Sequence, residues 1–377
     1  MAKVGILSMQ RIVNYGSFLQ AFGLKAMLED LGHEVQFVDY RVGAPLVEVK
    51  NKQRTGFKRK IYKAFEAINY EAPFNQKIQF ILYKKQFAKK YHAILNLTTT
   101  PNYTPELDVL IVGSDEVFNC VQHNPKVGYS LELFGKDNRA KKVISYAASF
   151  GNTTKAKLQQ YKKTDEIGNL LRDFEALSVR DENSAKVVRQ LIGQSPKYHL
   201  DPVLAYDYIG KCKLIPIIPS KEKYLILYAY SLRISAEEAN LISKYAKEKK
   251  LKIYAIGGVQ KCSDRFIDCS PFEVLAYFIN AEEVITDTFH GTIFSIIAKR
   301  QFTTLVRKSV GISYGNEEKL TDLLMRLNLS CRLIYDIREL SNIQNRPIDY
   351  AKIDFILEAE RKRTQEYLEL QIPRGNE

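Results

Sequence analysis

The sequence lacks the features that mark several common classes of protein. Its 377 residues include only five cysteines, an odd and scattered set, and Cys262 and Cys269 do not have zinc-finger spacing. No apolar run is long enough to span a bilayer, the start MAKVGILSMQ lacks a secretory signal pattern, and the dinucleotide fingerprint GxGxxG is absent. We therefore expect a cytoplasmic protein with reduced thiols, no targeting segment and no metal centre.

Positive charge is plentiful but confined to one region. The formal net charge is +13, and residues 50–90 hold twelve Lys or Arg and two acids, which accounts for +10 of that total. Phe57, Ile61 and Phe65 fall on one helical stripe, flanked by the basic residues 58–60. This pattern suits a helix on an anionic membrane. A solvated face packed on the first domain is the main alternative; nucleic-acid binding is the least favoured, and we expect no nucleic-acid partner.

Alternating strand and helix patterns predict an α/β fold. Lys3–Ser8 reads as a buried strand, Phe18–Leu31 as a helix and Glu34–Tyr40 as a second strand, which is a βαβ opening. Capping-box patterns begin two later helices, at Ser235 and Ser270. Further strands are expected at 108–112, 143–147, 176–179, 224–230, 251–256, 283–286 and 301–306, and further helices at 155–175, 183–192, 293–299, 320–327 and 350–370.

A stretch at about 206–222, which contains prolines and has little helical period, separates two α/β halves. We expect an N-terminal Rossmann-like domain over 1–205, with the basic segment at about 50–90 as a helical insertion. A C-terminal Rossmann-like domain should cover 223–349, and a helix and tail should cover 350–377. Two such domains suggest a cleft with the domains facing across it.

The run VITDTFHGTIFS at 284–295 changes from a strand into a helix through small polar residues, among them His290. Backbone N–H groups at a helix start are unpaired and the helix dipole favours an anion. A histidine there can transfer protons near neutral pH, although a histidine satisfied by its own turn would look the same in sequence. Candidate anion-binding residues are Asp287, Thr288, Gly291 and Thr292, with Arg307 and Lys308 after a later strand.

Polar residues also follow the predicted strands of the first half. Arg180 ends a short strand and can clamp a carboxylate or phosphate with two parallel hydrogen bonds; alternatively it forms a structural ion pair with Asp181 or Asp201. Asp115 can accept hydrogen bonds from hydroxyl groups, act as an acid or base, or cap a turn. The other candidates at strand ends are Asn14, Gly16, Ser17 and Ser149.

Six short segments occur in the order typical of one family. They are NYGSFLQ at 14–20, GSDEVFN at 113–119, SYAASFG at 145–151, SVRDENS at 178–184, LDPV at 200–203 and DTFHGT at 287–292. From about Val4 to Leu329 the chain resembles the polysaccharide pyruvyl transferase family. The resemblance implies a GT-B-like architecture, with donor and acceptor on the two faces of a cleft. It also implies phosphoenolpyruvate as donor substrate and a pyruvate ketal on a sugar as product, and we expect no cofactor.

We therefore predict a pyruvyl transferase acting on a capsular or exopolysaccharide repeat unit, lipid-linked or oligosaccharide. The alternative is a glycosyltransferase of the same plan that uses a nucleotide sugar. One departure is that several family members carry Arg-Leu-His where this chain has Thr288-Phe289-His290. The predicted roles are catalysis for His290 and Arg180, donor binding for Asp287, Thr288, Gly291, Thr292, Arg307 and Lys308, and acceptor binding for Asn14, Gly16, Ser17, Asp115 and Ser149.

Overall fold

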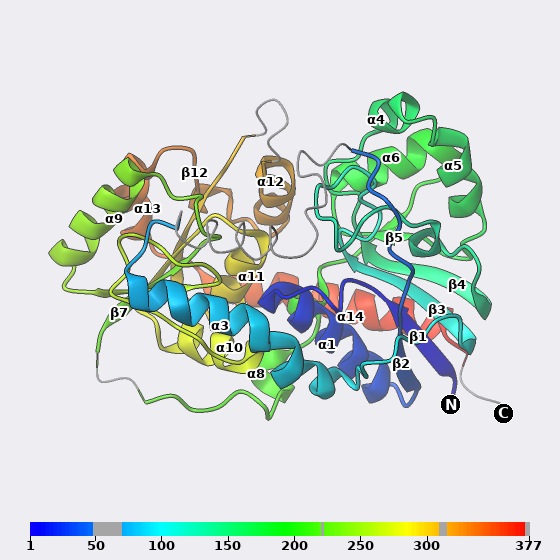
Figure 1. Ribbon diagram of the computed structural model, residues 1–377, viewed down its shortest axis with the longest axis horizontal. Helices are drawn as coiled ribbons and strands as arrows, with labels where there is room; N and C mark the ends of the chain where they lie inside the picture. Colours follow the sequence, from blue (N-terminus) through cyan, green and yellow to red (C-terminus); the bar gives the residue numbers. More distant parts are fainter. Residues whose placement is uncertain (48–69, 220–221, 309–314, 374–377) are drawn as a thin grey trace, which may run out of the picture. The chain divides into compact units, whose positions relative to one another are not determined.

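The computed structural model describes residues 1–47, 70–219, 222–308 and 315–373, which fall into two α/β units (Figure 1). Within these residues, unit 1 comprises 1–47, 92–207 and 354–373, and unit 2 comprises 70–91 and 208–353. Each unit has one six-stranded sheet, and all the strand pairs in both are parallel. The expected α/β class with two Rossmann-like sheets is confirmed.

The sheet of unit 1 has the strand order β2-β1-β3-β4-β5-β6. The chain leaves β1 toward β2 on one side and returns to β3 on the other, so the crevice at the carboxyl ends of β1 and β3 is the topological switch point, where such sheets bind ligands. The strands are β1 (Lys3–Leu7), β2 (Glu34–Val38), β3 (Glu106–Asp115), β4 (Arg139–Ala148), β5 (Ser178–Val179) and β6 (Lys197–Tyr198). The helices are α1 (Tyr15–Asp30), α4 (Lys155–Gln160), α5 (Thr164–Arg172), α6 (Glu182–Ile192) and α7 (Pro202–Ala205), with 3-10 turns at His92–Leu95 and Leu131–Phe134.

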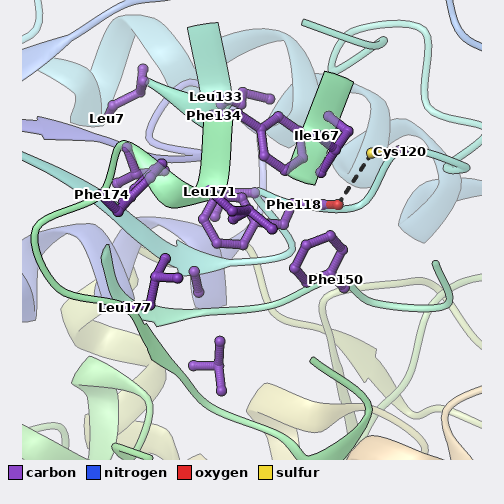
Figure 2. Packing of buried hydrophobic residues seen from close by; sticks show 14 of the residues in the cluster. Leu7, Phe118, Cys120, Leu133, Phe134, Phe150, Ile167, Leu171, Phe174 and Leu177 are labelled. Carbon is purple, nitrogen blue, oxygen red and sulfur yellow. Dashed lines mark hydrogen bonds between the residues drawn. The ribbon is translucent and has the colours of Figure 1, made fainter. Parts of the chain in front are cut away.

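An aromatic cluster anchors the segment that follows β3. The Phe118 ring lies 4.9 Å from that of Phe134 and 5.1 Å from that of Phe150, centroid to centroid. Ile167 and Leu171 of α5 belong to the same buried core (Figure 2). Because the three rings are almost fully buried, the backbone from the end of β3 onward is held firmly at the switch point.

The sheet of unit 2 has the order β12-β11-β10-β7-β8-β9, so its switch point lies between β7 and β10. The strands are β7 (Tyr224–Tyr228), β8 (Lys252–Ile256), β9 (Arg265–Phe266), β10 (Glu283–Thr286), β11 (Gln301–Leu305) and β12 (Leu333–Ile334). The helices are α3 (Phe74–Tyr91), α8 (Tyr208–Lys211), α9 (Ala236–Glu248), α10 (Pro271–Asn280), α11 (Phe289–Ile297), α12 (Glu317–Arg326) and α13 (Leu340–Gln344), with 3-10 turns at Ser330–Arg332 and Ile337–Glu339.

The described part of the basic segment groups with unit 2, and not with the first domain as we expected. On α3, the rings of Phe80 and Tyr83 meet Phe266 of β9 edge-on, with centroids 5.4 and 6.2 Å apart. The Gln76 side chain donates to the backbone oxygens of Ser263 and Asp264, each at 3.2 Å. The predicted stripe of Phe57, Ile61 and Phe65 lies outside the described residues.

The C-terminal helix α14 (Tyr350–Gln371) has its first residues in unit 2 and the rest in unit 1. At its start, the Tyr350 hydroxyl donates to the Arg300 backbone oxygen of unit 2 at 2.5 Å. Further along, Tyr367 donates to the Ser145 backbone oxygen of β4 at 2.8 Å. The expected division at residue 350 therefore differs from the packing, in which residues from Asp354 onward group with unit 1.

Most other differences from the predicted elements have a local cause. Both predicted capping boxes are present, and they begin α9 and α10. The helix α1 begins three residues before the prediction because Asn14 caps it. The single helix expected over 155–175 is split into α4 and α5, with Lys162 between them in the left-handed region at φ 55°.

Candidate functional site

At the switch point of unit 1, a hydrogen bond joins the segment that follows β1 to the last residue of β3. The Ser17 hydroxyl donates to Oδ2 of Asp115 at 2.7 Å. Asn14 sets this geometry, because its side-chain oxygen accepts from the backbone N–H of Gly16 at 2.7 Å and of Ser17 at 3.3 Å. Asn14 and Gly16 therefore build the start of α1, and Ser17 and Asp115 are the predicted acceptor residues whose side chains meet.

Arg180 is buried among carboxylates. Its Nη1 lies 2.8 Å from Oδ2 of Asp201, and its Nη2 lies 3.4 Å from Oδ1 of Asp115. Burial by itself would lower the pKa of Arg180, but the carboxylates of Asp115, Asp201 and Asp181 outweigh it and raise the pKa. Only 4% of Arg180 is exposed. The structural ion pair thus forms with Asp201 and Asp115, so Arg180 is placed to position Asp115.

Ser149 is also hydrogen-bonded within the protein. Its hydroxyl donates to Oδ2 of Asp181 at 2.6 Å, and Oδ1 of Asp181 accepts from the backbone N–H of Ser184 to cap α6. The backbone N–H of Ser149 donates to the backbone oxygen of Asp115 at 3.0 Å. Among the predicted residues from β3 and β4, only the Asp115 side chain, 16% exposed, remains accessible to a substrate hydroxyl.

In unit 2, the predicted strand-to-helix turn is present between β10 and α11. The helix begins at Phe289, four residues before the predicted start, because Thr288 is its N-cap. The Thr288 hydroxyl oxygen accepts from the Gly291 N–H at 2.9 Å, and the Thr288 backbone oxygen accepts from the Thr292 N–H at 3.2 Å. These two N–H groups, which we expected to be available to an anion, are therefore used by the cap.

Gly291 and Thr292 have packing roles at this turn. A Cβ at Gly291 would overlap the Thr286 hydroxyl and would approach the Tyr228 ring to 2.8 Å, so only glycine lets α11 come this close to β7 and β10. The fully buried Thr292 shares a hydrogen bond of 2.9 Å with Thr304 of β11. Both residues hold the helix start against the sheet.

His290 lies in the first turn of α11 and is 8% exposed. Its ring is 5.5 Å from the Phe289 ring and 6.2 Å from the Phe294 ring, centroid to centroid. Two close aromatic neighbours restrict the imidazole to few orientations. A proton donor held in this way at a switch point is suited to general acid catalysis.

Asp287 contributes a buried carboxylate to the turn. Its side chain is 0% exposed, and no donor among the described residues hydrogen-bonds to either carboxylate oxygen. Burial raises its pKa to about 6, although Arg233 and Arg307 oppose the rise. Its backbone oxygen accepts from the side chain of Asn316, which fixes the strand end while leaving the carboxylate unbonded.

Arg307, which follows β11, binds another acid. Its terminal nitrogens form a fork on Glu238 of α9, at 2.5 and 3.1 Å, and its Nε lies 3.7 Å from Oδ2 of Asp287. Lys308 extends over the Tyr335 ring, 5.1 Å from its centroid. Of the two predicted donor-binding cations, Arg307 therefore belongs to the Asp287 site and Lys308 contacts an aromatic ring.

Arg233 belongs to the same site and was not predicted. It follows β7, its Nη1 lies 3.7 Å from Oδ2 of Asp287, and its side chain is 34% exposed. The guanidinium carbon lies 5.1 Å from the centroid of the Tyr230 ring. The rule that polar residues after strand ends form sites would have found it, because the 224–230 strand was predicted. Its position two residues before a helix cap made it look like part of a connecting turn.

A match to a family model shows which family the chain belongs to. A family model described as polysaccharide pyruvyl transferase matches residues 14–309. The chain belongs to this family. The match covers most of the sequence and includes both the Ser17–Asp115 and the Asp287–His290 segments. No curated protein matches the chain by sequence.

Solved structures resemble this family member at low identity. The glycotransferase of kitacinnamycin is 11% identical, covers 99% of each chain and gives a TM-score of 0.48. UGT89C1 of Arabidopsis thaliana is 9% identical, covering 98% of this chain and 99% of that one, with a TM-score of 0.48. The UDP-GlcNAc 2-epimerase of Methanocaldococcus jannaschii is 13% identical, covering 95% and 99%, with a TM-score of 0.44.

The described residues hold neither a candidate metal cluster nor a candidate membrane-spanning helix. No group of three or more His, Cys, Asp or Glu in that part of the chain is arranged to hold a metal ion. No helix among those residues combines the length and the apolar character needed to cross a membrane.

Proposed function

We propose that the chain transfers a pyruvyl group from phosphoenolpyruvate to two hydroxyls of a sugar in a capsular or exopolysaccharide repeat unit. The observation that carries this proposal is the family match over residues 14–309. Support comes from the polar residues at the two switch points, which are where open α/β sheets bind ligands. The product is a pyruvate ketal, and the second product is inorganic phosphate.

The proposal assigns the donor to unit 2. Phosphoenolpyruvate carries a phosphate and a carboxylate, and therefore needs fixed cations. The guanidinium groups of Arg233 and Arg307 lie at the unit 2 switch point, each 3.7 Å from Asp287. In unit 1, by contrast, Arg180 is already paired with two carboxylates and has little charge left for an anion.

The acceptor is assigned to unit 1. A sugar hydroxyl needs a hydrogen-bond acceptor that can also take its proton, and the partly exposed carboxylate of Asp115 fits this requirement. Ser17 and Arg180 hold that carboxylate from two sides, at 2.7 and 3.4 Å. A carboxylate fixed in this way can hold one hydroxyl in a single orientation, which favours reaction.

The proposed reaction has two stages. In the first, His290 gives a proton to the methylene carbon of phosphoenolpyruvate, the acceptor oxygen bonds to the central carbon, and Asp115 takes the hydroxyl proton. In the second, the bond between that carbon and the phosphate oxygen breaks, and the phosphate leaves with its electron pair and a proton. A second hydroxyl of the same sugar then bonds to the carbon and gives up its proton. The protons lost by the two hydroxyls equal those gained by the methylene carbon and the phosphate, and exchange with solvent returns His290 and Asp115 to their starting states. The sum is donor plus diol giving ketal plus inorganic phosphate.

The test is a defined reaction with the purified chain. Phosphoenolpyruvate and a lipid-linked or oligosaccharide repeat unit should give inorganic phosphate and a product whose mass has increased by one pyruvyl ketal. His290→Ala should stop both signals. Turnover of a nucleotide sugar, with no mass gain from phosphoenolpyruvate, would overturn the proposal in favour of a glycosyltransferase.

We also propose that the enzyme works at the cytoplasmic face of a membrane, where a lipid-linked acceptor would lie. The described part of the basic segment offers a surface for this. Phe74, Ile78 and Leu82 of α3 are exposed, and their spacing of four places them on one side of the helix. Lys85 and Lys89, three and seven residues after Leu82, lie on the same side of the helix and are exposed too. Apolar and basic groups in this arrangement suit an anionic lipid surface.

A further inference from the structure

Three charged side chains meet at the switch point of unit 2. Arg233 follows β7, Asp287 follows β10 and Arg307 follows β11. Oδ2 of Asp287 lies 3.7 Å from Nη1 of Arg233 and 3.7 Å from Nε of Arg307. Each separation exceeds hydrogen-bond length, so these are contacts between charges without a shared proton.

The two arginines are not equivalent. Arg307 spends both terminal nitrogens on Glu238, and that side chain is also fixed by the capping box of α9. Among the described residues, the only carboxylate within 4 Å of Arg233 is that of Asp287, at 3.7 Å, and Arg233 is the more exposed of the two arginines. A guanidinium has five N–H donors in a planar fork that fits a phosphate or carboxylate. Arg233 therefore has its terminal nitrogens available for an incoming anion, whereas both terminal nitrogens of Arg307 are engaged by Glu238.

We infer that Arg233 binds the anionic group of the donor and that Asp287 is its exchangeable counter-ion, which takes up one proton from solvent when the anion binds. The ligand class is a phosphate- or carboxylate-bearing anion. Its identity as phosphoenolpyruvate rests on the proposed function; the anion site and the proton uptake do not.

The uptake of a proton is expected from the charges that surround Asp287. Arg233 and Arg307 face its carboxylate, Glu238 of α9 lies behind Arg307, Asn316 bonds its backbone oxygen, and His290 follows it on α11. With Asp287 ionised, the two arginines and the two acids balance. An anion on Arg233 adds a negative charge beside a carboxylate that has no hydrogen-bond donor among the described residues. Protonation of Asp287 restores the balance.

Isothermal titration with sulfate and with phosphoenolpyruvate tests this inference. Sulfate resembles phosphate but does not titrate near neutral pH, so any proton it moves belongs to the protein. At pH 7 in two buffers of different ionisation enthalpy, sulfate should bind the wild type with uptake of up to about one proton. Asp287→Asn should bind sulfate at least as tightly with no uptake.

Variants of Arg233 test the binding role. Arg233→Gln should weaken sulfate and phosphoenolpyruvate roughly ten- to a hundredfold, the usual effect of losing hydrogen bonds to a charged group, while Arg233→Lys should be intermediate. Arg265→Ala is the matched control, since Arg265 also sits over a tyrosine ring, 5.7 Å from that of Tyr254, and 3.4 Å from Glu222, but on β9. It should change neither affinity.

The outcomes separate this inference from the proposed function. Unchanged phosphoenolpyruvate affinity in both Arg233 variants, or no proton uptake by the wild type, overturns the inference and leaves pyruvyl transfer standing. Sulfate binding that depends on Arg233 and takes up a proton, with no phosphoenolpyruvate binding, supports the anion site and removes the proposed donor. Because Arg233 is one third exposed, its polar variants should fold, which circular dichroism would verify.

Discussion

Asp287→Asn should make the protein more stable at neutral pH although it alters the proposed donor site. The substitution removes a charge and keeps the shape of a side chain that is 0% exposed. Burial raises the pKa of Asp287 from 3.8 to about 6, so the folded carboxyl holds its proton more tightly than the unfolded one. Between these two pH values the native state binds more protons than the unfolded state, and its stability rises as the pH falls.

The magnitude follows from the same two values. Above pH 6 the carboxyl is ionised in both states, and the difference between about 6 and 3.8 corresponds to a cost of about 3 kcal/mol to the folded protein. Asparagine carries no such cost. For a cooperative unit of this size, 1 kcal/mol corresponds to about 2–4 °C, so Asp287→Asn should melt about 6–12 °C above the wild type at pH 8.

Differential scanning calorimetry at pH 8, 6 and 5 is the assay, and the difference between variant and wild type should shrink at each step. Asp336→Asn in the same unit is the control of opposite sign, because hydrogen bonds from Arg338 lower the pKa of Asp336 to about 2. That variant should not be stabilised at pH 8. If Asp287→Asn melts no higher than the wild type at pH 8, or if its advantage does not fall with pH, Asp287 is not a buried carboxyl of raised pKa and the reasoning about the charge cluster fails.

The remaining predictions concern catalysis, folding and membrane contact. His290→Ala should keep its melting temperature and lose at least about a hundredfold in kcat, the low end for a general acid; retained activity in the ketal assay would show a structural role. Arg180→Ala should lose about 3–5 kcal/mol in denaturant unfolding, because it leaves buried carboxylates unpaired; unfolding at the wild-type denaturant concentration would contradict the ion pair. Asp115→Asn should lower kcat with the sugar while phosphoenolpyruvate affinity in calorimetry stays unchanged; a change in both would place the donor in unit 1. Changing Phe74 and Leu82 together to Ser should reduce sedimentation with anionic vesicles at low salt and leave activity on a short soluble acceptor intact; equal sedimentation of variant and wild type would remove α3 from any membrane surface.

The features predicted correctly from the sequence are those that depend on residues close together in the chain. The capping boxes at Ser235 and Ser270 depend on side chains three residues apart, and both are present. The strand-to-helix turn at His290 was found because apolar residues change their period there. The start of α11 was missed because apolar periodicity resumes only at Ile293, whereas the cap at Thr288 begins the helix earlier.

Contacts between residues far apart in the chain could not be predicted, because the sequence does not reveal the order of the strands in a sheet. Ser17 and Asp115 meet only because β1 lies beside β3, and Arg233 and Asp287 meet only because β7 lies beside β10. The partners of Arg180 stayed open for the same reason. The helix α3 follows β2 along the chain, yet it packs on β9, a strand that lies far beyond it in the sequence.

The charge at each switch point supports the division of labour between donor and acceptor. In unit 1, one buried arginine is surrounded by Asp115, Asp201 and Asp181, so the site carries excess negative charge, which repels an anionic donor but accepts hydrogen bonds from hydroxyls. In unit 2, two arginines are balanced by Asp287 and Glu238, and a single proton on Asp287 is enough to give the site net positive charge. An anion therefore gains free energy at the second site and loses it at the first. The buried, unbonded carboxylate of Asp287 destabilises the fold at neutral pH, and the proposed reaction gives it a use: it holds Arg233 in place without binding it so strongly that the donor cannot displace it.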